Sequence, residues 1–174
     1  MGYAGGSKPS PTYHALGDHT ETLQIDFDPS VISYAELLAL FWANHAPTRP
    51  AWKRQYRSMV MTHGDEQQRL ALAAKSAREL ELGQELHTEI LPSRAFHLAE
   101  DYHQKYYLRR VPALTQEFER MYPAVEGLVA STAAARVNGY LGGHGDRAAR
   151  DRDLERLGLS AAGVEALLER VRPR

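Results

Sequence analysis

The chain has 174 residues, a formal net charge of -1 and a composition typical of one globular domain, with 43% hydrophobic and 25% charged residues. This balance gives the chain as a whole no basic field that would attract nucleic acid or anionic lipid, and no run approaches the roughly 20 apolar residues that span a bilayer. Because Met1–Gly6 lacks the features of a signal peptide we expect a cytoplasmic protein, and the absence of cysteine excludes disulfides, thiolate metal sites and a cysteine nucleophile within these residues.

The first predicted elements are a loop and a strand. Glycines and prolines dominate residues 2–11, which predicts turns and loop. Leu23, Ile25 and Phe27 alternate with polar residues, so we expect residues 21–27 to form a half-buried strand.

A helix is predicted next, over residues 34–45. Ser33 and Glu36 have the spacing of a capping box, in which the serine hydroxyl accepts from the glutamate N–H and the carboxylate accepts from the serine N–H. Apolar residues follow at three- and four-residue spacing until Pro47. A second apolar run, residues 55–62, is short enough to be a buried strand.

A further helix and strand complete an alternating order. Asp65 is expected to cap a helix that ends at Gly83. The inward face of this helix is expected to carry four apolar residues, Leu70, Ala73, Ala77 and Leu80. Residues 86–90 alternate again and predict a strand before Pro92, which gives the order strand, helix, strand, helix, strand.

The remainder of the chain is expected to be mainly helical. Residues 99–107 are helical or tightly turned, and Pro112 opens a helix because its fixed φ suits the first helical position. Residues 142–152 are rich in Gly, Arg, Ala and Asp and predict a linker. Ser160 precedes a last amphipathic helix, which either docks on the domain or stays mobile.

Three segments, in this order along the chain, together resemble the methionine sulfoxide reductase A family. The first is Gly-Tyr-Ala-Gly-Gly at 2–6, followed by Pro-Thr-Tyr at 11–13 and His-Thr-Glu at 19–21. The second is Phe-Trp-Ala-Asn-His-Ala-Pro-Thr at 41–48, followed by Gln-Tyr-Arg-Ser at 55–58. The third is Ala-Glu-Asp-Tyr-His-Gln at 99–104.

The resemblance implies an α+β fold, a two-layer ferredoxin-like sandwich of the methionine sulfoxide reductase A type with extra C-terminal helices. We expect this domain to span residues 1–143, and residues 144–174 to form an Arg/Ala-rich tail with a short amphipathic helix. In the family, a Gly-Cys-Phe-Trp strand and a helix precede the glycine-rich turn. Both are absent here, which implies a truncated domain without its catalytic cysteine, and we expect the coding region to continue upstream of Met1.

The resemblance also assigns site residues for the reduction of the S epimer of methionine sulfoxide. A cysteine thiolate attacks the sulfur, a protonated carboxylic acid lets the oxygen leave as water, and tyrosine hydroxyls hold that oxygen. Glu21 matches the acid, while Tyr13 and Tyr56 match the hydroxyl donors, so all three are expected to be catalytic and to bind substrate. Without the resemblance, Glu21 is interpreted as a solvated carboxylate at a strand edge and the tyrosines as half-buried amphipathic residues.

Two departures from the family pattern concern specificity and recycling. The loop Arg49–Arg54 is shorter than in most members and lacks their supporting aspartate, and Trp52 either lines a pocket for the substrate methyl group or packs on the surface. Residues 138–143 resemble a tail that carries a recycling cysteine in some members, with Leu141 at that position. The resemblance therefore implies a single-cysteine enzyme reduced directly by thioredoxin or a small thiol.

No bound cofactor is expected, and the eight scattered histidines lack metal-binding spacing, so we also expect no metal. The expected partners are proteins or peptides that contain methionine sulfoxide, and thioredoxin. The protein is expected to be a monomer that binds neither nucleic acid nor membrane. Three functions remain open at this point: a repair enzyme, a catalytically inactive module that binds methionine sulfoxide, and a fragment without activity.

Overall fold

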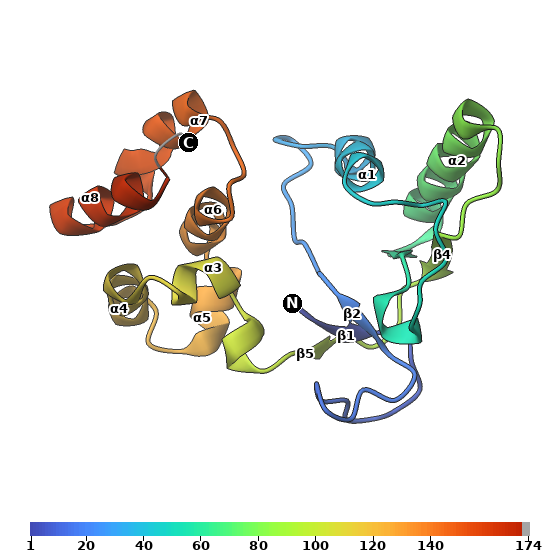
Figure 1. Cartoon of the computed structure of the whole chain (residues 1–174), viewed down its shortest axis with the longest axis horizontal. Coiled ribbons are helices and arrows are strands. Elements are labelled where there is room, and N and C mark those ends of the chain that lie inside the picture. Colours follow the sequence, from blue (N-terminus) through green and yellow to red (C-terminus); the bar gives the residue numbers. More distant parts are fainter. Residues whose placement is uncertain (172–174) are drawn as a thin grey trace. The chain divides into compact units, whose positions relative to one another are not determined.

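The computed structural model describes residues 1–171, which form two units: unit 1, Met1–Ala99, and unit 2, from Glu100 onward (Figure 1). Unit 1 contains two small sheets and the helices α1 and α2, and unit 2 is helical. The protein is therefore of mixed α/β class. Within residues 1–171, no helix combines the length and the apolar character needed to cross a bilayer.

The first sheet has a buried central strand where the sequence predicted only loop. Its order is β2-β1-β5, with β1 (Gly2–Ala4) antiparallel to both β2 (Thr20–Thr22) and β5 (His97–Leu98). Tyr3 and Ala4 are each 1% exposed. The expectation of loop for residues 2–4 was therefore wrong, because three buried residues paired on both edges are too few to produce an alternating pattern.

The strand expected over residues 21–27 is shorter than its pattern indicated. It ends at Thr22, and the next residues lie outside any ladder. Leu23 and Ile25 are 65% and 54% exposed. The predicted strand is confirmed only at residues 21 and 22, and the alternating residues 23–27 have no partner strand among residues 1–171.

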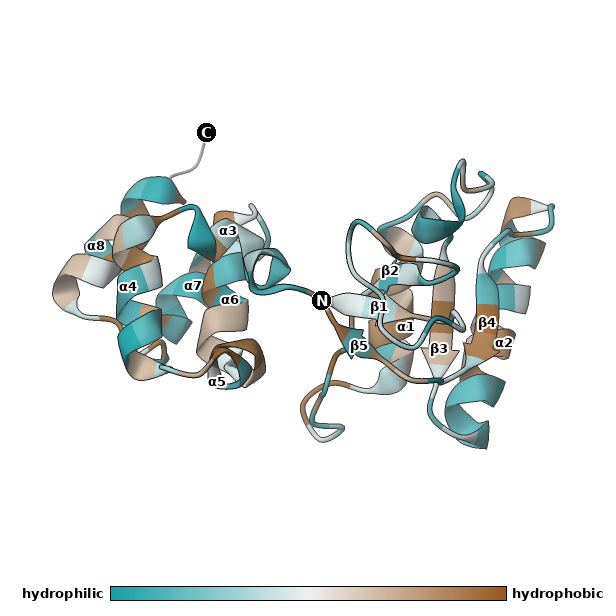
Figure 2. Ribbon diagram, turned by 90° about the horizontal axis from the view of Figure 1, so that it is seen from below, coloured by the Kyte–Doolittle hydropathy of each residue, from teal (hydrophilic) through white to brown (hydrophobic). Residues whose placement is uncertain are grey.

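The second sheet consists of two parallel strands, β3 (Met59–Thr62) and β4 (Glu89–Pro92), with mostly hydrophobic residues (Figure 2). The strand expected from residue 55 begins at Met59, because Arg54–Tyr56 forms the 3-10 helix η1. The strand expected over residues 86–90 is displaced toward the C-terminus and includes Pro92. Pro92 is tolerated at this end, where the next bond of the ladder comes from the Ser93 N–H to the Thr62 carbonyl at 2.9 Å.

Helix α1 (Tyr34–Ala43) begins with the expected capping box. The Ser33 hydroxyl accepts from the Glu36 N–H at 3.2 Å, and the Glu36 carboxylate accepts from the Ser33 N–H at 2.8 Å. The second helix of unit 1 is α2 (Asp65–Leu82). The core that α1 and α2 share with β3 and β4 has four buried residues, Leu38, Trp42, Ala71 and Leu86.

Two details of α2 differ from expectation. Gly64, with φ +87°, is the N-cap, and Asp65 is the first helical residue, where its charge suits the positive end of the helix dipole. Ala71 is fully buried, whereas Leu80 is 84% exposed. The predicted inward face was misplaced because leucines and alanines occur on several faces of α2.

Over its described residues, 100–171, unit 2 packs six α-helices and two 3-10 turns around its own core. Its elements in chain order are η2 (Asp101–His103), α3 (Tyr106–Arg109), α4 (Pro112–Met121), α5 (Val125–Ala130), α6 (Thr132–Leu141), α7 (Arg147–Asp153), η3 (Leu154–Arg156) and α8 (Ala161–Arg170). The side chains of Leu114, Phe118, Val137 and Leu167 are fully buried in this core. The helix predicted from Pro112 is confirmed.

The C-terminal part is more ordered than its composition indicated. Helix α7 begins inside the segment expected to be a linker and ends one residue beyond it; Asp146 caps this helix and accepts from the Ala149 N–H at 2.6 Å. Helix α8 begins after Ser160, as predicted. It docks on α4, since Glu117 accepts from the Ser160 N–H at 2.9 Å and Leu167 is buried.

Candidate active site

Glu21 lies on β2, directly opposite Tyr3 of the central strand. Its side chain is half-buried, and one carboxylate oxygen accepts from the Gln55 side-chain amide at 3.4 Å. Gln55 is part of η1, the 3-10 helix that also contains Tyr56. The structure therefore brings the segment of Tyr56 next to the strand of Glu21.

Arg57 fixes the position of η1 on the sheet. Its guanidinium donates to the Thr20 hydroxyl at 2.8 Å and to the Gly5 carbonyl at 3.1 Å, and it forms an ion pair with Glu89 at 3.1 Å. The Arg57 side chain is only 14% exposed. One side chain thus joins the turn after β1, the strand β2 and the strand β4 to the segment that carries Tyr56.

Tyr13 lies on the loop between β1 and β2, which folds around the buried side chain of His19. The Gly6 N–H donates to Nδ1 of His19 at 3.2 Å, so the ring proton is on Nε2, which donates to the Lys8 carbonyl at 2.8 Å. Arg54 of η1 donates to the Asp18 carbonyl on this loop at 3.2 Å. The three elements that carry Tyr13, Glu21 and Tyr56 are thus joined by hydrogen bonds.

Asp18 closes the base of this loop through its side chain. Its carboxylate accepts from the Ser7 N–H at 2.8 Å. This hydrogen bond lowers the pKa of Asp18 from 3.8 to about 2. This bond therefore favours the ionised form of Asp18 and is stronger when the carboxyl group is ionised.

Both candidate tyrosines are accessible to a ligand. Tyr13 and Tyr56 are 42% and 43% exposed. The Tyr56 ring lies 5.4 Å from the ring of Trp52, which is itself 75% exposed. Trp52 therefore packs on the exposed Tyr56. The Lys53 ammonium lies 4.6 Å from the centre of the Trp52 ring.

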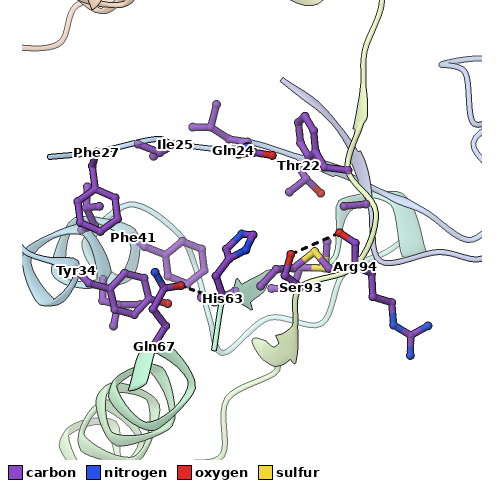
Figure 3. Close-up of a pocket in the computed structure, with 18 residues that line it drawn as sticks. Thr22, Gln24, Ile25, Phe27, Tyr34, Phe41, His63, Gln67, Ser93 and Arg94 are labelled. Carbon is purple, nitrogen blue, oxygen red and sulfur yellow. Dashed lines mark hydrogen bonds between the residues drawn. The ribbon is translucent and has the colours of Figure 1, made fainter. Parts of the chain in front are cut away.

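A mainly apolar cavity of about 220 Å³ lies in unit 1 and includes Thr22, the neighbour of Glu21. The extended segment after Thr22, with Ile25 and Phe27, lies across from Tyr34 and Phe41 of α1 (Figure 3). The buried Tyr34 hydroxyl has no hydrogen-bond partner among residues 1–171. Burial also raises the pKa of Tyr34.

The sequence pointed to Tyr56 but not to the two residues beside it that build the site. Gln55 and Arg57 belong to the same Gln-Tyr-Arg-Ser segment, and this motif is the signal that could have identified them. Their partners are distant in the chain and could not be read from it. In the described part of the chain, no group of three or more His, Cys, Asp or Glu residues could hold a metal ion.

A family model described as peptide methionine sulfoxide reductase matches residues 1–137. A peptide methionine sulfoxide reductase of Drosophila melanogaster is 43% identical over 92% of this chain and 65% of its own length. Peptide methionine sulfoxide reductase A5 of Oryza sativa subsp. japonica is 40% identical over 80% of this chain and 57% of its own length. The chain thus spans less than two thirds of the length of these curated relatives.

A similar fold has been solved by crystallography. The structure of Mxr1 from Saccharomyces cerevisiae in reduced form matches 64% of this chain and 69% of the yeast chain, with a TM-score of 0.57 and 32% sequence identity. The family match, the relatives and this structure agree with one another. The chain belongs to the peptide methionine sulfoxide reductase family.

Proposed function

We propose that this chain supplies the acid and the oxygen-binding groups of a peptide-methionine (S)-S-oxide reductase, which repairs oxidised proteins in the cytoplasm. The match of the family model over residues 1–137 carries the proposal. The hydrogen bonds that join the loop, β2 and η1 support the assignment of Tyr13, Glu21 and Tyr56 to one site. Tyr13 and Tyr56 bind the sulfoxide oxygen, and Glu21 protonates it.

The proposed reaction needs a thiol. A cysteine thiolate attacks the sulfoxide sulfur, Glu21 donates a proton to the oxygen, and the products are methionine and a cysteine sulfenic acid. A second thiol attacks the sulfenic sulfur, releases water and leaves a disulfide, which a reduced thiol partner cleaves. The sum is one sulfoxide and two thiols converted to methionine, a disulfide and water.

The nucleophilic cysteine is proposed to lie on a strand outside these 174 residues, which contain no cysteine. We propose that this strand would lie in the cavity beside Thr22. Two observations support this position: among residues 1–171, β3 pairs only with β4, and the buried Tyr34 hydroxyl has no hydrogen-bond partner. A strand placed there would pair with β3 and cover the exposed Leu23 and Ile25. It would also complete the proposed two-layer ferredoxin-like sandwich.

Recycling is proposed to depend on thioredoxin or a small thiol, because Leu141 stands where some members carry a second cysteine. We further propose a monomer, with a reductase domain that ends near residue 143 and a C-terminal tail from residue 144. Proteins and peptides with oxidised methionine are the proposed substrates.

The function is tested with the natural polypeptide, its cysteine-bearing segment included. We expect thiol-dependent reduction of a peptide that contains methionine S-sulfoxide, and no reduction of the R epimer, measured by separating the two peptides chromatographically. A folded, cysteine-bearing protein that reduces neither epimer would exclude the proposal. If the region upstream of Met1 encodes no cysteine, the remaining candidate is a module that only binds the sulfoxide, which a titration with oxidised and reduced peptide detects.

A further inference from the structure

A second cavity lies entirely within unit 2, among α6, α7 and α8. Its volume is about 550 Å³. The residues that line it include Tyr140 and Leu141 at the end of α6, the connection Gly142–Asp146, and Arg147 at the start of α7. Val171 lines it as well, and none of these residues belongs to the proposed reductase site.

The cavity has a surplus of cationic side chains. Arg147, Arg150 and Arg170 all line it. The Asp151 carboxylate forms ion pairs with two of them, with Arg150 at 2.7 Å and with Arg147 at 3.5 Å. Arg170 forms no ion pair with any residue of the described chain, and the Asp146 carboxylate caps α7. Three guanidinium groups therefore line the cavity beside one carboxylate, that of Asp146, while Asp151 lies outside the lining and pairs with two of the arginines.

Arg150 is held in place before any ligand arrives. Its side chain is 10% exposed, and it donates to the Asp151 carboxylate and to the Val171 carbonyl, the latter at 3.3 Å. A buried guanidinium needs partners for its N–H groups, and this one is anchored at the wall of an open cavity. It is a preorganised donor for an anion.

The connection Gly142–Asp146 lets backbone approach the cavity closely. Gly143 and Gly145 have φ +83° and +84°, which side chains rarely adopt. The Tyr140 ring lies 2.8 Å from the position of a Cβ on Gly145, whereas nothing lies within 4 Å of that position on Gly143. Space is therefore open beside Gly143, whose own N–H donates to the Tyr140 carbonyl at 3.0 Å.

We propose that this cavity binds a small molecule with a phosphate group. A phosphate accepts from several guanidinium groups at once and carries more charge than a carboxylate, which suits three arginines. The cavity is much larger than the roughly 30 Å³ occupied by one water, so it has room for an organic group as well. The rings of Tyr140 and His144 line it and offer apolar surface to that group.

The test is a calorimetric titration of the full 174-residue chain, at constant ionic strength, with phenyl phosphate, inorganic phosphate and benzoate. Phenyl phosphate and inorganic phosphate are expected to bind saturably, and benzoate at least about tenfold more weakly than phenyl phosphate. Tighter binding of phenyl phosphate identifies a phosphate ester as the ligand, and equal binding identifies free phosphate. No saturable binding of either phosphate, or benzoate binding as tight as phenyl phosphate, would overturn the proposal.

A matched pair of variants locates the site. Arg170→Gln removes the guanidinium that has no ion-pair partner among residues 1–171, and we expect phosphate binding to weaken by about tenfold. Arg156→Gln removes another exposed arginine of unit 2 that lies outside the cavity, and binding should remain within about twofold. Circular dichroism confirms that both variants are folded. Equal losses in the two variants would assign the binding to general surface charge and refute the site.

Discussion

Arg57 and His19 determine how the candidate active site is built, although neither received a role from the sequence. Arg57 bonds to Glu89, Thr20 and Gly5, which are 32, 37 and 52 positions away along the chain. Motif matching identified the segments that contain these residues, but it cannot indicate which segments contact each other. The segments that carry the candidate site residues could therefore be identified from the sequence, and the hydrogen bonds that join them could not.

The Asp18 carboxylate gives a pH-dependent prediction for the loop that carries Tyr13. Its pKa in the folded protein, about 2, is below the ordinary 3.8, so its bond to the Ser7 N–H stabilises the loop above that ordinary value and is lost as the pH falls through about 2. We expect the amide resonance of Ser7 in nuclear magnetic resonance spectra to titrate with a midpoint of about 2.

Two amide variants test this assignment. Asp18→Asn should abolish the titration of the Ser7 amide resonance, because the side chain no longer ionises. Asp26→Asn replaces another exposed aspartate and should leave the titration unchanged. A wild-type midpoint of 3.8, the ordinary value, would mean that the bond does not form in solution.

At the level of elements, short-range signals predicted the helices better than the strands. The start of α1 depends on the contact of Ser33 with Glu36, three residues away, and was predicted correctly. Strand β1 depends on partners in β2 and β5, so its three residues carried no local signal. At α7 the composition predicted a linker where the structure has a helix, because glycine and charged residues surround a segment that Asp146 caps.

The capping box of α1 provides a stability prediction. Ser33→Ala removes the acceptor for the Glu36 N–H, and we expect the free energy of unfolding to fall by about 1 kcal/mol. Urea denaturation followed by circular dichroism measures the change. The control is Ser76→Ala at an exposed interior position of α2, which should change stability by less than about 0.5 kcal/mol. Equal effects of both substitutions would contradict a capping role.

At the scale of the whole molecule, the chain divides into two compact units with separate core clusters. Unit 1 carries Tyr13, Glu21 and Tyr56, and unit 2 is stabilised by its own helices. The family resemblance indicated the class of fold and chemistry, but not the boundary after Ala99, since contacts between distant residues define it. In the proposed function, unit 1 carries the acid and the oxygen-binding groups, and another segment carries the nucleophile.

The most direct measurement is the rate at which the cysteine-bearing protein reduces a methionine S-sulfoxide peptide after Glu21→Gln. A glutamine cannot donate the proton that the oxygen needs, so we predict that the rate falls by at least about 100-fold. The control, Glu85→Gln, changes an exposed glutamate outside the site and should leave the rate unaltered. A Glu21→Gln protein that keeps its rate within about threefold of the wild type would contradict the role assigned to this carboxyl group.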